Sequence, residues 1–192
     1  MKTKYFAVAV AMLFACTGAK AQEKSSSITI GFAPIGSISV NQSLRNYEFS
    51  YDYESYWNAS IGYEKQLKGV VSLTELTYAQ AKSNNLKWPD ADLTSVTLMT
   101  YAGKTFNRNK RLQIPVYIGI GGEYFRGGPL HNLAVDLGLK ARVKFYITNH
   151  IALFGGVTGR FGLGTKKTEN SDEFYSLCPQ TWALDAGLIF GI

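Results

Sequence analysis

Charged side chains recur at every second position in several apolar segments of the chain, and their types and spacing could do chemistry. The clearest case is the segment from 131 to 147, where Asp136, Lys140, Arg142 and Lys144 alternate with apolar residues. In an extended strand, alternate residues point to opposite faces. The same alternation in other segments adds five more, so that nine candidate residues lie on one face of a sheet: Glu64, Glu75, Glu123, Asp136, Lys140, Arg142, Lys144, Arg160 and Asp185.

Charges gathered on a buried face need partners, because an isolated buried charge is costly or neutralises. We therefore expect acidic and basic side chains to pair, Asp136 with Arg160 and Lys144 with Glu64. This predicts a network of salt bridges that plugs the interior of a barrel in place of an apolar core. A narrow or gated path for ions is the alternative interpretation.

Enzymatic chemistry has little support in the sequence. His131 and His150 fall at opposite ends of the expected strands, so they cannot share one site, and Cys178 has no histidine nearby. No zinc-ligand spacing, phosphate-binding loop or Gly-x-Ser-x-Gly motif is present. We expect no enzyme activity, no catalytic residues, no bound metal and no cofactor.

The elements that would position the charges are eight segments with strand character. The sixth is the longest alternating run, longer than the roughly 5–6 residues of a typical soluble strand but suited to a tilted membrane-crossing strand. Leu73 and Leu76 have opposite parity, which predicts a bulge or irregularity in the third segment, and Pro115 is expected near the start of the fifth or at a bulge. The segments are 27–38, 55–65, 69–80, 93–106, 111–125, 131–147, 150–163 and 180–192.

The connections alternate between short and long. Links at 66–68, 107–110 and 148–149 are tight and polar, while those at 39–54, 81–92 and 164–179 are long, with 126–130 shorter than expected for its side. Outer-membrane barrels have short periplasmic turns and longer external loops. The pattern predicts both termini in the periplasm and the long loops outside the cell.

Aromatic residues cluster near both ends of the expected strands, which predicts two girdles at the membrane interfaces. A ligand-binding aromatic cluster in the first loop, around 47–53, is the alternative for part of the outer set. The outer set is Tyr51, Tyr53, Tyr56, Trp57, Tyr78, Trp88, Tyr124, Phe125, Phe161 and Trp182, and the periplasmic set is Tyr63, Phe106, Phe145, Tyr146 and Phe190.

The N-terminus has the features of an export signal. Two early lysines precede an apolar run that ends at Cys16, and Ala19-Lys20-Ala21 forms a small-x-small cleavage site, so we expect cleavage after Ala21. The segment around Cys16 partly matches a lipoprotein box, which leaves lipidation as the alternative. The segment 22–192 then carries 17 basic and 14 acidic residues, which does not argue for nucleic acid. Only Cys178 remains, so no intramolecular disulfide is possible.

The last strand and the internal motifs together resemble a known family. The signal ending Ala-Gln, the eight alternating segments, the stretch Arg111-Leu-Gln-Ile-Pro-Val-Tyr-Ile-Gly-Ile-Gly-Gly and the ending Leu188-Ile-Phe-Gly-Ile192 are similar to small outer-membrane β-barrels of the OmpA/OmpX type. The resemblance is strongest to the outer-membrane β-barrel domains of Bacteroides-like bacteria. It implies contact with outer-membrane lipids and with the barrel-assembly machinery, which reads the face formed by Trp182, Leu184, Leu188, Phe190 and Ile192. Such chains usually end in an aromatic residue, whereas this one ends in Ile192.

These observations predict an all-β protein: a signal peptide at 1–21 and an eight-stranded antiparallel up-and-down transmembrane β-barrel at 22–192, located in the outer membrane of a Gram-negative bacterium. The expected role is structural or surface-interactive, through the external loops of a plugged barrel. Two alternatives remain open. One is porin-like transport of ions or hydrophobic solutes, and the other is a soluble lipocalin-like carrier, which would turn its apolar face inward.

Overall fold

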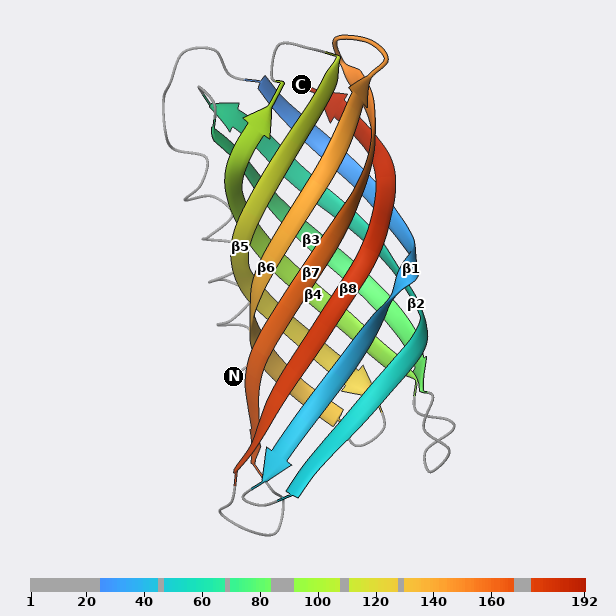
Figure 1. Ribbon diagram of the computed structural model, residues 1–192, viewed down its shortest axis with the longest axis vertical. Coiled ribbons are helices and arrows are strands. Elements are labelled where there is room, and N and C mark those ends of the chain that lie inside the picture. Colours follow the sequence, from blue (N-terminus) through green and yellow to red (C-terminus); the bar gives the residue numbers. More distant parts are fainter. Residues whose placement is uncertain are drawn as a thin grey trace.

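The computed structural model is a closed β-barrel of eight strands (Figure 1), and it describes residues 25–44, 47–67, 70–83, 92–107, 111–127, 130–167 and 174–192. Each strand pairs antiparallel with its neighbour in sequence, and β8 closes the barrel on β1. The predicted fold class is therefore confirmed. The strands are β1 (Ser25–Leu44), β2 (Tyr47–Leu67), β3 (Val70–Ser83), β4 (Leu93–Phe106), β5 (Leu112–Gly127), β6 (Leu130–Tyr146), β7 (Ile151–Lys167) and β8 (Phe174–Gly191).

Ser25, where β1 begins, and the C-terminus lie at the same end of the barrel, which we name the terminal end. The Ile192 amide donates a hydrogen bond to the Ser26 carbonyl at 2.8 Å, which ties the last residue to the first strand. The opposite end, where β1 meets β2 and β7 meets β8, is the distal end. Residues 1–24, which include the expected signal peptide and Cys16, lie outside the described residues.

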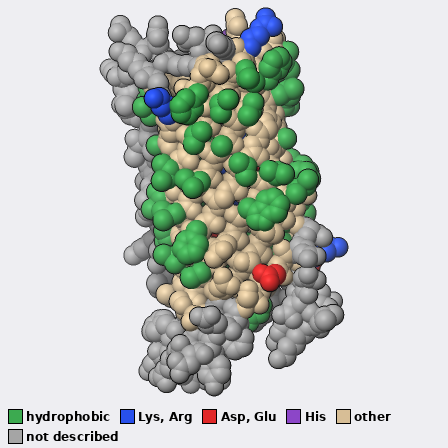
Figure 2. Space-filling view, in the orientation of Figure 1, with side chains coloured by type: hydrophobic (Ala, Val, Ile, Leu, Met, Phe, Trp, Pro, Cys, Tyr) green, Lys and Arg blue, Asp and Glu red, His purple; other side chains and the backbone are tan. Residues whose placement is uncertain are grey.

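The wall of the barrel is apolar outside and polar inside. Along β6, Leu133, Val135, Leu137 and Leu139 face outward, and Leu139 is 64% exposed, while the intervening charges are buried. Figure 2 shows hydrophobic side chains over one face of the wall, with charged side chains toward its ends. The strands have 14 to 21 residues, more than the roughly 9–11 that a tilted strand needs to cross a bilayer. A closed barrel with this outer surface satisfies its backbone internally and suits lipid.

None of the described segments is a helix that could cross a bilayer.

Two adjacent bulges bend the wall in β1 and β2. The register of β1 with β8 shifts between Phe32 and Ile35, and Pro34 lies at this point, where a missing N–H costs no ladder bond. The register of β2 with β3 shifts between Glu54 and Trp57. Each shift inserts one residue and reverses the facing of the strand beyond it.

The irregularity expected in the third segment is absent from β3. Its pairing with β4 runs without a shift from Val70 to Ala81, so that expectation was wrong. Leu73 points into the barrel and Leu76 points out. Leu73 and Leu76 have opposite parity because Leu73 is an apolar residue on the inward face of a regular strand. Pro115 lies four residues into β5, close to its start, as expected.

The long loops expected at 39–54 and 164–179 are mostly strand. β1 continues to Leu44 and β2 begins at Tyr47, while β7 continues to Lys167 and β8 begins at Phe174. The polar composition of these stretches suggested loops, but polar side chains can lie on both faces of a sheet that extends into water. Of the third expected loop, 81–92, β3 includes residues up to Ser83, and 84–91 lie outside the described residues.

The extra length builds a projecting sheet at the distal end. Among the described residues, β2 pairs with β3 from Tyr53 onward, and β7 pairs with β6 as far as Gly164. Beyond these points β7, β8, β1 and β2 remain paired with one another. In Figure 1, the hairpin of β1 and β2 reaches farthest at the bottom of the view. We define the projecting sheet as residues 39–44, 47–52, 165–167 and 174–178.

The aromatic girdles are only partly as expected. Phe32, Trp57 and Tyr78 form an outward row with ring centroids 6.2 and 5.9 Å apart. Tyr124, Phe161 and Trp182 also face outward near the distal end, and Phe106, Phe145 and Phe190 near the terminal end. Tyr51 and Tyr63 are half-buried, and Trp88 lies outside the described residues.

Four aromatics assigned to the girdles lie inside instead: Tyr53, Tyr56, Phe125 and Tyr146. The β2 bulge reverses the facing of Tyr53. The two mouths of the barrel also need large side chains to fill them, which a simple girdle rule ignores.

The face of β8 expected to guide assembly lies on the outside of the barrel. Five side chains of this face are exposed on the outer surface: Trp182, Leu184, Leu188, Phe190 and Ile192. The inward face of the same strand carries Thr181, Ala183, Asp185 and Ile189, all of them buried. β8 thus alternates as its sequence indicates.

Candidate functional site: a charge network inside the barrel

The nine charged residues singled out in the sequence all lie inside the barrel. The most exposed of them, Arg160, is only 8% accessible. They come from β2, β3, β5, β6, β7 and β8, and β6 contributes four, in the order Lys144, Arg142, Lys140 and Asp136 from the terminal to the distal end. The side chains form three groups along the barrel.

The terminal group is one ion pair with a tyrosine. Lys144 on β6 forms a salt bridge with Glu64 on β2. The Tyr117 hydroxyl donates a hydrogen bond to the second Glu64 oxygen at 2.8 Å. One cation therefore faces one carboxylate, and the group is neutral.

The middle group holds two cations and two carboxylates. Glu75 on β3 binds both Lys140 and Arg142, one with each oxygen. Asp185 on β8 lies 3.1 Å from the Arg142 Nη2 and 3.7 Å from the Lys140 ammonium. The Arg142 guanidinium also lies over the Phe154 ring at 4.2 Å. The group is neutral and reaches across the lumen, from β3 to β6 and from β6 to β8.

The distal group centres on Arg160 of β7. Its guanidinium donates to the Thr97 hydroxyl and lies 3.7 Å from Glu123 and 3.6 Å from Asp136. Thr97 in turn donates to Glu123 at 3.3 Å. One cation here faces two carboxylates, so the formal charge of this group is unbalanced.

Glycines make room for these side chains. Tyr101, Gly119, Gly138 and Arg160 lie in one row across four neighbouring strands. A Cβ on Gly119 would come 2.4 Å from the Tyr101 ring, and one on Gly138 would meet Met99 at 2.8 Å. The two glycines therefore leave space inside the barrel for the Tyr101 ring and the end of the Met99 side chain.

Apolar clusters lie at both ends of the network. The larger one, the distal layer, lies toward the projecting sheet, and the smaller one, the terminal layer, lies on β7 and β8 with Tyr146 packed against it. The distal layer contains Ala33, Ile38, Val40, Tyr53, Tyr56, Ala79, Ala81, Leu93, Phe125, Ala134, Leu177 and Ala183, and the terminal layer contains Ala152, Phe154 and Ile189.

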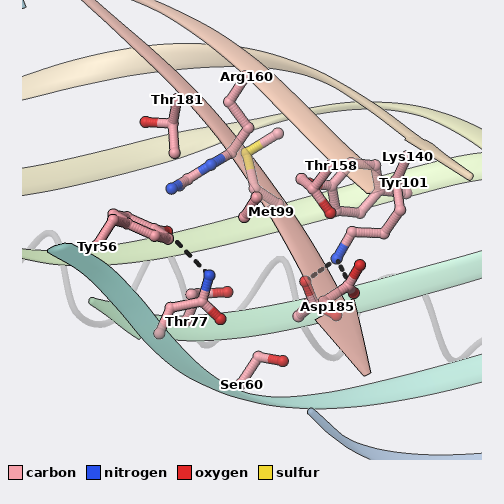
Figure 3. Close-up of a pocket in the computed structure, with 13 residues that line it drawn as sticks. Tyr56, Ser60, Thr77, Met99, Tyr101, Lys140, Thr158, Arg160, Thr181 and Asp185 are labelled. Atoms are coloured by element: carbon pink, nitrogen blue, oxygen red, sulfur yellow. Dashed lines mark hydrogen bonds and ion pairs between the residues drawn. The ribbon is translucent and has the colours of Figure 1, made fainter. Parts of the chain in front are cut away.

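A small internal cavity separates the middle group from the distal group. Its volume is about 20 Å³, close to the space of one water molecule. Figure 3 shows Arg160 reaching toward Tyr56 on one side, and Lys140 bound to Asp185 on the other. The Thr158 and Thr181 hydroxyls and one Asp185 oxygen line it without hydrogen-bond partners among the described residues. The cavity is too small to be a continuous aqueous path.

Sequence reasoning missed several buried residues. Met99, Tyr101 and Leu73 pack beside the network, and the strand alternation of β4 could have found Met99 and Tyr101. Lys65 is also buried, although its neighbour Glu64 holds the inward position. No simple alternation predicts this, because Lys65 lies near the turn that joins β2 to β3.

The described part of the chain holds no group of three metal-ligating residues. What the arrangement can do is electrostatic: it holds opposite charges in contact inside the barrel.

Comparisons with known proteins identify the fold. No family model and no curated protein matches the chain. Among solved structures, the outer-membrane protein AlkL in DMPC lipid bilayers matches with a TM-score of 0.58 at 12% identity, covering 91% of this chain and 93% of AlkL. Neisserial surface protein A matches with a TM-score of 0.53 at 12% identity, covering 88% and 99%. OprG from Pseudomonas aeruginosa matches with a TM-score of 0.52 at 12% identity, covering 88% and 95%.

The closed eight-stranded wall and its apolar outer surface define a membrane-spanning β-barrel. Its fold is that of the small outer-membrane β-barrels, the type expected from the sequence. The outer surface and this fold agree with the predicted outer-membrane location.

Proposed function

We propose that the protein is a closed outer-membrane barrel that presents its distal end for interaction, and that it does not conduct. The observation that carries this proposal is the combination of a filled lumen with a projecting sheet. The fold alone does not set the role, because small barrels host several functions.

The filled lumen argues against a water-filled channel. The charges are paired across the lumen in at least two of the three groups, and apolar layers lie at both ends. An eight-stranded barrel has an interior just wide enough for its own side chains. An ion crossing it would have to displace the salt bridges and both apolar layers.

The projecting sheet favours an interaction role. Its β2 edge, residues 47–52, has no register partner on β3 among the described strands. Among the described residues the sheet ends at this strand, and an extended segment of another chain can add to an open sheet edge. The expected surface role thus moves from long loops to a sheet edge.

The orientation belongs to the same proposal. An even number of strands returns both ends of the barrel to one side, and outer-membrane barrels extend farther outside the cell than into the periplasm. The distal end, where β1, β2, β7 and β8 are longest, therefore faces the outside and the terminal end faces the periplasm. The expected signal peptide at 1–21, cleaved after Ala21, supports export. The outward face of β8, from Trp182 to Ile192, is then available to the barrel-assembly machinery.

Transport remains the second candidate function. The observation that favours it is the outer hollow beside Gly159, about 650 Å³, between Leu137, Leu139, Phe161 and Trp182. A hydrophobic solute could rest there. The outer hollow and the small lumen cavity share two lining residues, Arg160 and Thr181. The lipocalin-like alternative is wrong, because the apolar face points outward and the charges point inward.

Conductance and accessibility test the proposal together. The purified barrel in planar bilayers should give no stable current, because its lumen is filled. A protease-site tag inserted between Leu44 and Tyr47 should be cut on intact cells, and the same tag inserted at 148–149 should be cut only after the outer membrane is opened. Large steady currents would contradict the closed lumen, and the reverse cleavage pattern would contradict the orientation.

A further inference from the structure

The distal group of the network contains one carboxylate more than it has cations. Arg160 is its single guanidinium, and it faces Glu123 and Asp136. These acids are 1% and 0% exposed, so water cannot compensate the second charge. The middle and terminal groups are each balanced, which confines the surplus to this place.

The Asp136 carboxylate also lacks a hydrogen-bond donor. No donor among the described residues reaches either oxygen, and the Arg160 contact at 3.6 Å is too long for a hydrogen bond. The Glu123 and Asp136 carboxyl groups both lie within 3.7 Å of the same Arg160 guanidinium, on its two Nη atoms. Two ionised carboxylates have no proton to donate, whereas one proton between them makes one of the acids a donor.

The other groups that face this pair do not supply the missing charge. Tyr56 from β2 and Thr97 and Tyr101 from β4 are neutral hydroxyl groups. Lys140, the next cation along β6, is bound to Glu75 in the middle group. From β3 and β8, Thr77 and Thr181 line the cavity beside Arg160 with neutral hydroxyl groups.

The packing described around Asp136 does not favour a hydrated metal ion at this site. The nearby cavity of about 20 Å³ is lined by Arg160, but by neither Glu123 nor Asp136. Asp136 instead packs against Gly162, where an added Cβ would come 2.4 Å from its Oδ1 and 2.5 Å from the Pro179 ring. A proton needs no cavity, so it can balance the surplus charge in this packing.

We propose that Glu123 and Asp136 share one proton in the folded barrel at neutral pH, which makes the Arg160, Glu123 and Asp136 group a proton-storing site in the distal plug. When the proton leaves at alkaline pH, two buried carboxylates face one guanidinium and repel each other. The contacts of Arg160 with Glu123 and Asp136 in the distal group then weaken.

This site gives stability a definite pH dependence. In the unfolded chain both acids are ionised at neutral pH, so folding takes up one proton. The native state then binds more protons than the unfolded state, and stability falls as pH rises. The ratio of folded to unfolded barrel should drop by up to about tenfold for each pH unit while the folded state still holds the proton.

Infrared spectroscopy of the barrel in lipid vesicles tests the proposal directly. The wild-type protein at neutral pH should show the C=O stretch of a buried carboxylic acid, and this band should vanish at alkaline pH. Asp136→Asn and Glu123→Gln should each remove the band, because the remaining acid is then balanced by Arg160 and ionises. The control Asp52→Asn, on the exposed projecting sheet, should leave the band in place.

Urea unfolding at several pH values gives the second measurement. The wild-type protein should lose stability as pH rises, and Asp136→Asn should lose most of that slope. Glu123→Gln replaces it if the first variant does not fold. The proposal is overturned if the wild-type band is absent at neutral pH, if the band survives in both single variants, or if wild-type and Asp136→Asn share one slope. A stability that changes with the sodium concentration and not with pH would also overturn the proposal, in favour of a bound cation.

Discussion

Each cation singled out inside the barrel contacts an acid on another strand, so the charge network joins residues that are far apart in the sequence. Glu75 is the most connected of them, because it binds Lys140 and Arg142 at once. Breaking a buried pair by removing one partner leaves the other charge uncompensated, which is the costly situation. The loss of stability on removing one charged residue therefore depends on whether its partner is left without an opposite charge.

Glu75→Gln should destabilise the barrel by about 3–5 kcal/mol, because two cations would then share Asp185 alone. Adding Lys140→Met to this variant removes the surplus cation and should restore part of the loss, since the pair and not the position matters. Urea unfolding in lipid vesicles measures both changes. Losses that simply add in the double variant would show that the two residues do not interact.

The sequence predicted which charges lie inside, but not all of their partners. Strand alternation has a period of two, so the facing of Lys140, Arg142 and Lys144 follows from their spacing. The link from Glu75 to Lys140 and Arg142 joins β3 to β6, which are not neighbours in the barrel. Contacts across a lumen depend on strand tilt and register, and neither can be read from one strand.

The strands themselves were predictable in number and facing, and less so in length. β6 and β8 alternate cleanly, so their residues lie where the pattern puts them. The distal parts of β1 and β2 are rich in Asn, Ser and Tyr. The local sequence does not show whether such residues form a loop or a sheet exposed to water. The bulges at Pro34 and before Trp57 are likewise set by how neighbouring strands fit the curved wall.

The facing of β6 gives a prediction at the scale of one element. Leu139→Arg should cost about 2–4 kcal/mol, because this outward side chain lies deep in the apolar wall. Ile147→Arg, just past the end of β6 and also exposed, should cost about 0–1 kcal/mol, because it lies near the membrane interface. Unfolding free energies in vesicles compare the two. Equal costs would mean that Leu139 does not lie at membrane depth.

The whole molecule combines two surfaces with opposite demands. The wall must suit lipid, so its charges lie inside, while the distal projecting sheet extends beyond the barrel and carries exposed Ser50 and Asp52. Closure depends on β8, which pairs with β7 on one side and β1 on the other. The same strand that completes the barrel therefore also carries the expected assembly face.

Assembly in the cell and folding in vitro should respond differently to changes on that face. Phe190 pairs with Ile28 and Ile151 at the terminal end and is the last outward aromatic residue of the chain. Phe190→Ala should reduce the fraction of protein assembled in the outer membrane much more than Leu184→Ala does, because an assembly factor would read the end of the strand. The two variants should lose similar stability in vesicles, since both side chains are large, apolar and outward. Heat-modifiability gels of membrane fractions measure assembly, and urea unfolding measures stability. If assembly falls only in proportion to stability in both variants, the end of β8 is a structural strand and not a recognition signal.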